Sequence, residues 1–116
     1  MELVALLSSG KGSWGQVAGV IKEGEWDNIF LIGDEFAKKF STKEKHEFLQ
    51  IDTDKQIKDL KEEILDKLKG KIKGAEVALS IASGNGKEHM ALISALLSLP
   101  VGIRFSVLTK EGLLSL

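Results

Sequence analysis

The chain has 116 residues, is 43% hydrophobic and 28% charged, and carries a formal net charge of -1. These values predict one globular domain over residues 1–116, and they exclude the strong positive charge that attracts duplex nucleic acid or an anionic membrane. The absence of cysteine excludes disulfides and thiolate metal sites.

Three further features bear on the class of protein. The two histidines, His46 and His89, are too few and too far apart to predict a metal site, and we expect neither a metal nor a cofactor. No run reaches the about 18 apolar residues of a membrane span and no signal peptide precedes the first apolar run, so we expect a cytoplasmic protein. Arg104 is the only arginine among 16 basic residues, a preference for lysine that is typical of thermophile proteins.

Apolar runs alternate with helical patterns along the chain. The runs that predict strands are 3–7, 28–33, 46–52, 76–82 and 102–109. The first, second and fourth are continuously apolar, as in strands buried on both faces. The last alternates in polarity, which predicts a half-exposed strand at the edge of the sheet.

Helical patterns fill the intervals between these runs. Residues 14–22 carry an apolar stripe, and Asp34 is placed to cap a short helix. A longer amphipathic helix begins at Asp54, with apolar residues at i, i+3, i+7 and i+11, and the last helix lies near 88–98.

The resulting order of elements, β-α-β-α-β-α-β-α-β, predicts a Rossmann-like α/β fold. We expect a three-layer sandwich whose five-stranded, mostly parallel sheet has helices on both faces and right-handed crossovers. The first and fourth strands are the most uniformly apolar and hence the most central, so the expected strand order is 3-2-1-4-5.

Such a sheet binds ligands beyond the carboxyl ends of its strands, at the point where the strand order reverses. Here that point lies between the first and fourth strands, and the loops that follow them are the two most glycine-rich of the chain: "SSGKGSWG" (8–15) and "ASGNGKEH" (82–89). Each loop contains a lysine and leads into a helix N-terminus, where free N–H groups favour anions. The sequence therefore predicts an anion site, although these glycines would also suit ordinary tight turns.

The first loop partly matches two known phosphate-binding motifs. Gly10, Gly12 and Gly15 form a G-x-G-x-x-G, and Asp34 follows the second strand where a dinucleotide fold has its ribose-binding acid. Against this fingerprint, two serines lengthen the turn and Lys11 adds a bulky cation within it. "SSGKGS" also matches four of six positions of the S-G-G-x-D-S loop of adenylating enzymes, with glycine where that loop has aspartate.

The second loop is not a Walker A motif. Ile81 stands where its first glycine belongs, and Glu88 follows Lys87 where a serine or threonine is needed. Glu88 and His89 could act as acid or base beside a bound phosphate, or could cap and solvate a helix start. Trp14 could stack on a base or anchor its loop to the core.

Hydroxyl groups that could bind phosphate or ribose occur in both loops, at Ser8, Ser9, Ser13 and Ser83. The helix near 88–98 is apolar almost all round, and we expect nothing else in so small a monomer to cover it. The pattern therefore predicts a homodimer through this helix, with the apolar tail "LLSL" joining the same surface.

The segments "VALLSSGKGSWG", "DNIFLIGDE", "EVALSIASGNGKEHMALISALL" and "VGIRFSVLT" together resemble the CRISPR-associated Rossmann fold family, whose members act in antiviral defence. The resemblance is strongest over residues 77–99, with a Gly-rich turn, a lysine, Met90 and an apolar helix in family-like places. It implies a homodimer that binds a cyclic oligoadenylate across its two-fold axis. The ligand contacts it implies are Ser8, Ser9, Gly10, Lys11, Gly12 and Ser13 from one loop, and Ser83, Gly84, Asn85, Gly86 and Lys87 from the other.

Some proteins of that family also cleave the ring slowly, which implies catalytic roles for two residues: Lys87 would stabilise the phosphate charge, and Ser9 would orient the nucleophile or the phosphate. The chain departs from the family pattern in being short, in lacking the usual sixth strand or reducing it to the tail, and in lacking an R-x-x-x-x-H ribonuclease motif. We therefore expect a stand-alone binder of a small nucleotide. An NAD- or ATP-linked protein and a scaffold subunit with purely structural glycine loops remain open.

Overall fold

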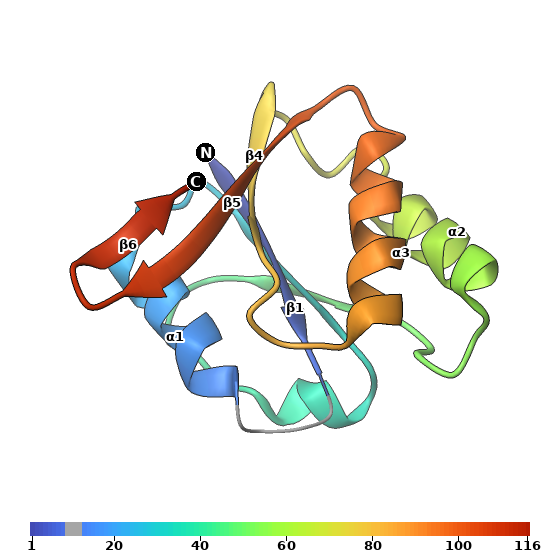
Figure 1. The fold of residues 1–116 in the computed structure, drawn as a ribbon, viewed down its shortest axis with the longest axis horizontal. Helices are drawn as coiled ribbons and strands as arrows, with labels where there is room; N and C mark the ends of the chain where they lie inside the picture. The colour runs from blue at the N-terminus through green and yellow to red at the C-terminus, as the bar shows by residue number, and fades with distance from the viewer. Residues whose placement is uncertain (9–12) are drawn as a thin grey trace.

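The computed structural model describes residues 1–8 and 13–116 (Figure 1), and six strands of these residues form one sheet. The strands are β1 (Glu2–Leu7), β2 (Ile29–Gly33), β3 (Glu47–Gln50), β4 (Glu76–Ser80), β5 (Gly102–Thr109) and β6 (Gly112–Ser115). Their order in the sheet is β3-β2-β1-β4-β5-β6. The first five pair in parallel, and β6 pairs antiparallel with β5. The predicted fold class and the order 3-2-1-4-5 are confirmed.

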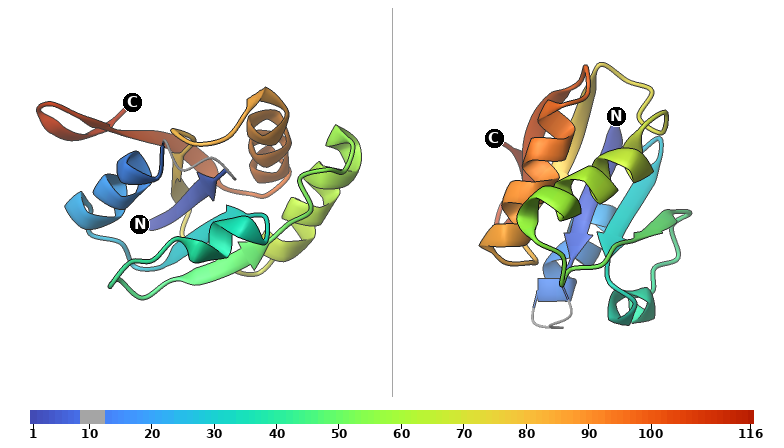
Figure 2. Two further views of the ribbon diagram at one scale, coloured as in Figure 1. Left: turned by 90° about the horizontal axis from the view of Figure 1, so that it is seen from below. Right: turned by 90° about the vertical axis from the view of Figure 1, so that its right-hand side faces the viewer.

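Helices cover both faces of this sheet and complete three layers (Figure 2). Helix α1 (Trp14–Glu23) and the 3-10 helix η2 (Phe36–Lys39) lie on one face. Helices α2 (Ile57–Leu68) and α3 (Gly86–Leu97) lie side by side on the other. No helix within residues 1–8 and 13–116 is long and apolar enough to cross a membrane.

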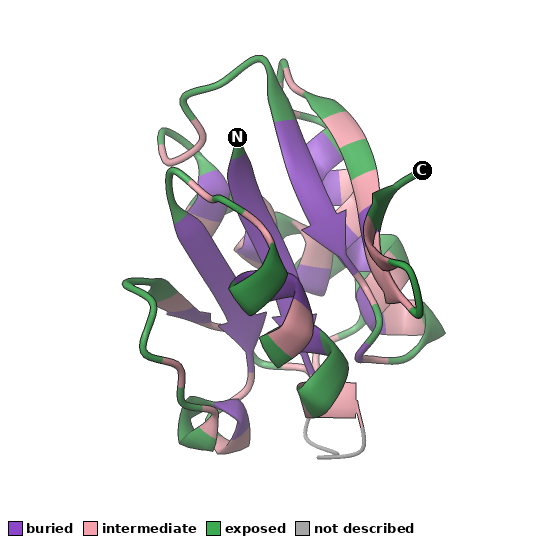
Figure 3. Ribbon diagram, turned by 90° about the vertical axis from the view of Figure 1, so that its left-hand side faces the viewer, coloured by how far each residue is buried: buried purple, intermediate pink, exposed green. Residues whose placement is uncertain are grey.

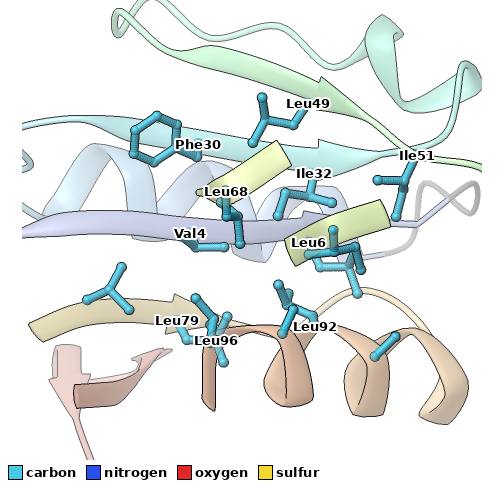
Figure 4. Close-up of a cluster of buried hydrophobic side chains, with 14 of the residues drawn as sticks. Val4, Leu6, Phe30, Ile32, Leu49, Ile51, Leu68, Leu79, Leu92 and Leu96 are labelled. Carbon is cyan, nitrogen blue, oxygen red and sulfur yellow. The ribbon is translucent and has the colours of Figure 1, made fainter. Parts of the chain in front are cut away.

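The central strands are buried because their side chains face helices on both sides. All six residues of β1 are buried, and β1 lies between β2 and β4 (Figure 3). Leu6 and Leu79 pack with α2 and α3 in one core cluster, which also contains Leu60 and Leu92 (Figure 4). The second cluster joins β1, β2 and α1, and the small side chain of Ala78 belongs to it.

The C-terminal tail corrects the expectation of a five-stranded sheet. Residues 112–115 form β6, so the sheet has six strands and β5 is not its edge. The first half of β5 pairs with β4 and its second half pairs with β6. The positive φ of Gly112, +105°, allows the tight turn between β5 and β6. The hairpin lies against α1 (Figure 1). Leu113 packs against the second core cluster, which includes side chains of α1.

Two predicted helix starts were wrong by two or three residues. Helix α2 begins at Ile57 rather than Asp54, because the Asp52 side chain accepts a hydrogen bond from the Asp54 N–H and holds a turn there. Helix α3 begins at Gly86 because Asn85 is its N-cap.

The prediction that nothing within the monomer would cover α3 was also wrong. Helix α2 packs along it, and one side of α3 is buried in the shared core. The buried α3 side chains are Glu88, Ala91, Leu92, Ala95 and Leu96. The outer side of the helix remains exposed at Met90 and Leu97.

Candidate functional site

The carboxyl ends of β1 and β4 meet where the strand order reverses. From β1 the chain crosses to β2 on one side, and from β3 it returns to β4 on the other. Ser8 follows β1 and Ser83 lies three residues beyond β4. The Ser8 N–H donates a hydrogen bond of 2.7 Å to Ser83 Oγ, so the starts of the two glycine-rich loops are in direct contact.

Ser83 is buried, with 1% of its surface exposed, and its backbone takes part in a second hydrogen bond. Its carbonyl oxygen lies 2.8 Å from Nε2 of His89, in the first turns of α3. Because a carbonyl oxygen only accepts hydrogen bonds, Nε2 of His89 carries a proton.

Trp14, the first residue of α1, is an anchor for the loop that precedes it. Its Nε1 donates a 2.9 Å hydrogen bond to the Ser8 carbonyl. Its ring centroid lies 5.8 Å from those of Phe36 and Phe40, and the contact with Phe40 is edge-on. Aromatic pairs in such tilted arrangements favour one ring position. The loop start is thereby tied both to α1 and to the region around η2.

The second loop depends on a glycine at position 84. Gly84 has a φ of +105°, and a Cβ atom there would lie 2.4 Å from Leu6 Cδ2. The same Cβ would lie 3.0 Å from Glu88 Oε1 and 3.1 Å from His89 Nε2. The loop therefore packs directly against the end of β1 and the start of α3, with no room for a side chain.

A capping box begins α3. The Asn85 side chain accepts from the Glu88 N–H at 2.9 Å, and the Glu88 carboxylate accepts from the Asn85 N–H at 3.0 Å. Glu88, a predicted acid or base, is thus buried as a cap and places negative charge in the first turn. The first-turn N–H groups that could still bind an anion are those of Gly86 and Lys87, and Gly86 has open space around it.

The ammonium group of Lys87, a predicted phosphate ligand, contacts the backbone of another loop. Its Nζ donates to the carbonyl oxygens of Thr53 and Lys55, at 2.7 and 2.9 Å. Lys87 therefore holds the turn between β3 and α2 against the start of α3. An ammonium group has three N–H donors, so one remains for a further acceptor. Sequence reasoning missed these two carbonyls because a backbone acceptor leaves no trace in residue type.

Four predicted site residues, Ser9, Gly10, Lys11 and Gly12, lie outside the described residues. Ser13 is the N-cap of α1 and makes no side-chain capping bond.

Gly15 and Asp34 belong to the dinucleotide-binding interpretation, and their surroundings in the structure do not match that interpretation closely. The space where a Cβ of Gly15 would lie is open, so helix packing does not require this glycine, as the third glycine of that fingerprint would. Asp34 Oδ1 accepts from the Ala37 N–H at 3.0 Å, as expected of a cap for η2.

A cavity of about 660 Å³ lies at the same edge of the sheet, beside β2 and β3. Its carboxylates are Asp34, Glu35, Asp52, Asp54 and Glu63, and Lys67 is the one cation among the described residues that line it. This negative charge opposes a phosphate group there. The β1–β4 junction is therefore the better place for an anion. No cluster of three His, Asp or Glu side chains in the described part of the chain could hold a metal ion.

The strand order and the crossovers define a Rossmann-like α/β fold. The ligand crevice of such a fold would lie between β1 and β4, where Ser8 and Ser83 join the starts of the two glycine-rich loops. The sequence matches no model of a known protein family and no curated protein.

Proposed function

We propose that this protein binds a nucleotide at the junction of the loops after β1 and β4. The observation that carries the proposal is the hydrogen bond between Ser8 and Ser83, which joins the starts of the two glycine-rich loops at the topological switch point. Doubly wound folds bind nucleotides at this point, because strand ends and helix N-termini converge there.

The phosphates would lie against backbone donors at the start of α3. The N–H groups of Gly86 and Lys87 belong to the first helical turn, and the third N–H of the Lys87 ammonium can add a charged hydrogen bond. The Ser13 hydroxyl is an additional donor, whereas the buried Ser83 hydroxyl holds the Ser8 N–H. Binding would rest mainly on fixed backbone groups, since Lys87 is already held by two carbonyls.

The resemblance to the CRISPR-associated Rossmann fold family makes a cyclic oligoadenylate the first ligand to test. Under this proposal, Ser8 to Lys11 contact it from one loop and Gly84 to Lys87 from the other. Slow cleavage would follow from alignment: the ribose 2′-hydroxyl attacks the adjacent phosphorus and the bond to the 5′-oxygen breaks, which leaves a 2′,3′-cyclic phosphate. The 2′-hydroxyl proton leaves to water, and the departing 5′-oxygen takes a proton from water to become a hydroxyl. Ser9 would orient the attacking group or the phosphate, and Lys87 would stabilise the phosphate charge.

A homodimer is part of the same proposal, and the outer side of α3 supports it. Met90 and Leu97 are 60% and 71% exposed, with the half-buried Ile93 between them. No charged residue occurs between Glu88 and Arg104. Two copies could therefore meet along α3 without burying an ion.

The hairpin also carries apolar side chains that a second copy could cover. Phe105 is half-buried against the core cluster that Ile93 also contacts, and Leu114 of β6 is exposed.

A thermal-shift panel with cyclic tetra- and hexa-adenylate, NAD, ATP and AMP tests the proposal. A ligand present at 100 times its Kd stabilises the folded state by about 2.7 kcal/mol, which raises Tm by several degrees. A rise with a cyclic oligoadenylate supports the proposal, and analysis of the incubated ligand then reports cleavage. A rise only with NAD or ATP favours a dinucleotide or adenylating protein. A folded protein that responds to none is a scaffold subunit.

A further inference from the structure

A chain of hydrogen bonds joins four residues from four segments around the candidate site. Trp14 of α1 donates to the Ser8 carbonyl, and the Ser8 N–H donates to the Ser83 hydroxyl. His89 of α3 donates to the Ser83 carbonyl. The chain therefore runs from one helix start to the other across the carboxyl ends of β1 and β4.

We propose that Trp14 and His89 are positioning residues that act through this chain to set the spacing between the two loops. Ser8 is held through both its N–H and its carbonyl, and Ser83 through both its hydroxyl and its carbonyl. A shift of the His89 ring therefore moves the Ser83 peptide, and Ser83 moves the Ser8 amide. Ser8 and Ser83 behave as one unit, although 75 residues separate them.

The surroundings of His89 leave its ring little freedom. A Cβ on Gly84 would lie 3.1 Å from Nε2, so the ring lies directly against the backbone of the second loop. The ring contributes one essential property to the chain, an N–H aimed at the Ser83 carbonyl. Glutamine can supply such a donor from a side chain of similar reach, whereas phenylalanine cannot.

Hydrogen exchange of the Ser8 amide tests the chain without any ligand. The His89 ring is hydrogen-bonded to Ser83, and the Ser8 amide to the Ser83 hydroxyl. A merely local role for His89 therefore leaves the Ser8 amide unaffected. The proposal predicts that His89→Phe speeds exchange of the Ser8 amide at least about tenfold, while His89→Gln stays close to wild type. Ser98→Ala, on an exposed residue at the C-terminal end of α3, is the control and should leave exchange of the Ser8 amide unchanged. Retained protection of the Leu92 and Leu96 amides shows that α3 is folded in each variant.

Unchanged exchange of the Ser8 amide in His89→Phe, with α3 folded, overturns the proposal. Faster exchange of the Ser8 amide in Ser98→Ala as well would also overturn it, because the effect would then belong to the helix and not to the chain of hydrogen bonds.

Breaking the chain of hydrogen bonds should also weaken nucleotide binding. This consequence rests on the proposed function, and a double-mutant cycle with cyclic tetra-adenylate tests it. Trp14→Phe removes the indole N–H while keeping an aromatic ring. If each single variant weakens binding about fivefold, the double variant should also lose about fivefold, because both break one chain. A loss of about 25-fold means independent effects and overturns the coupling. If wild type binds no nucleotide, the proposed function fails. The exchange experiment alone then tests whether the chain of hydrogen bonds couples His89 to Ser8.

Discussion

Ser8 and Ser83 are joined by a 2.7 Å hydrogen bond in which the backbone of one loop binds the side chain of the other. Ser83 is buried, so its hydroxyl serves as an internal acceptor at the junction of β1 and β4. This contact holds the starts of the two glycine-rich loops together, which would lower the entropy cost of binding under the proposed function.

Replacing Ser83 by alanine should destabilise the fold by about 1–2 kcal/mol, because the half-buried Ser8 N–H loses the hydroxyl that accepts its hydrogen bond. Urea denaturation followed by circular dichroism measures the change. Ser115→Ala, on an exposed residue of β6, is the control and should fall within about 0.5 kcal/mol of wild type. Equal stability of Ser83→Ala and wild type would show that the contact contributes nothing.

Gly84→Ala should cost about 2–3 kcal/mol of stability, since it combines a φ of +105° with a Cβ placed 2.4 Å from Leu6 Cδ2. Gly86→Ala is the matched variant two residues away. Its Cβ meets open space, so we expect its stability to be unchanged or slightly raised. Thermal unfolding of both variants checks the contrast, and equal losses would contradict the packing seen around Gly84.

Glu2 stabilises the loop after α2 from the buried start of β1. Its carboxylate accepts hydrogen bonds from the Lys73 N–H at 2.8 and 3.1 Å and from the Gly74 N–H at 2.9 Å. Glu2→Gln replaces one acceptor with an NH₂ group facing those donors, so we expect a loss of about 2 kcal/mol.

The control for Glu2 is Glu76→Gln, which removes the exposed ion pair with Arg104. This variant should change the free energy of unfolding by less than about 1 kcal/mol. A smaller loss for Glu2→Gln than for Glu76→Gln, in urea denaturation, would refute the structural role of Glu2.

Ser80→Ala should stabilise the protein by up to about 1 kcal/mol. The Ser80 side chain is fully buried, and its hydroxyl has no hydrogen-bond partner among the described residues. Differential scanning calorimetry would show a higher Tm for the variant. A lower Tm would mean that the hydroxyl has a partner in the folded protein.

Sequence patterns predicted the parts of the structure that depend on burial along a single segment. The continuous apolar character of 3–7 and 76–82 predicted their central places in the sheet, and hence the meeting of the loops that follow them. Contacts between distant segments were not predictable in the same way. The bonds from Lys87 to the carbonyls of Thr53 and Lys55 depend on where the β3–α2 turn packs.

The prediction that nothing would cover α3 was wrong for a similar reason. Periodicity showed that one side of residues 57–68 is apolar, but it did not show that this side would share a core with α3. The tail was missed as a strand because "LLSL" has no alternation, and the pairing of Leu113 with Leu108 forms only through the turn at Gly112.

The measurement that tests the central claim most directly is isothermal titration of cyclic tetra-adenylate into wild type, Gly86→Asp and Gly86→Asn. Position 86 is open to solvent at the first turn of α3, so both variants should fold. If the phosphates bind at this helix start, the aspartate repels them and weakens binding at least about tenfold, while the neutral asparagine changes it little. Equal affinities in all three proteins would place the ligand elsewhere and contradict the account.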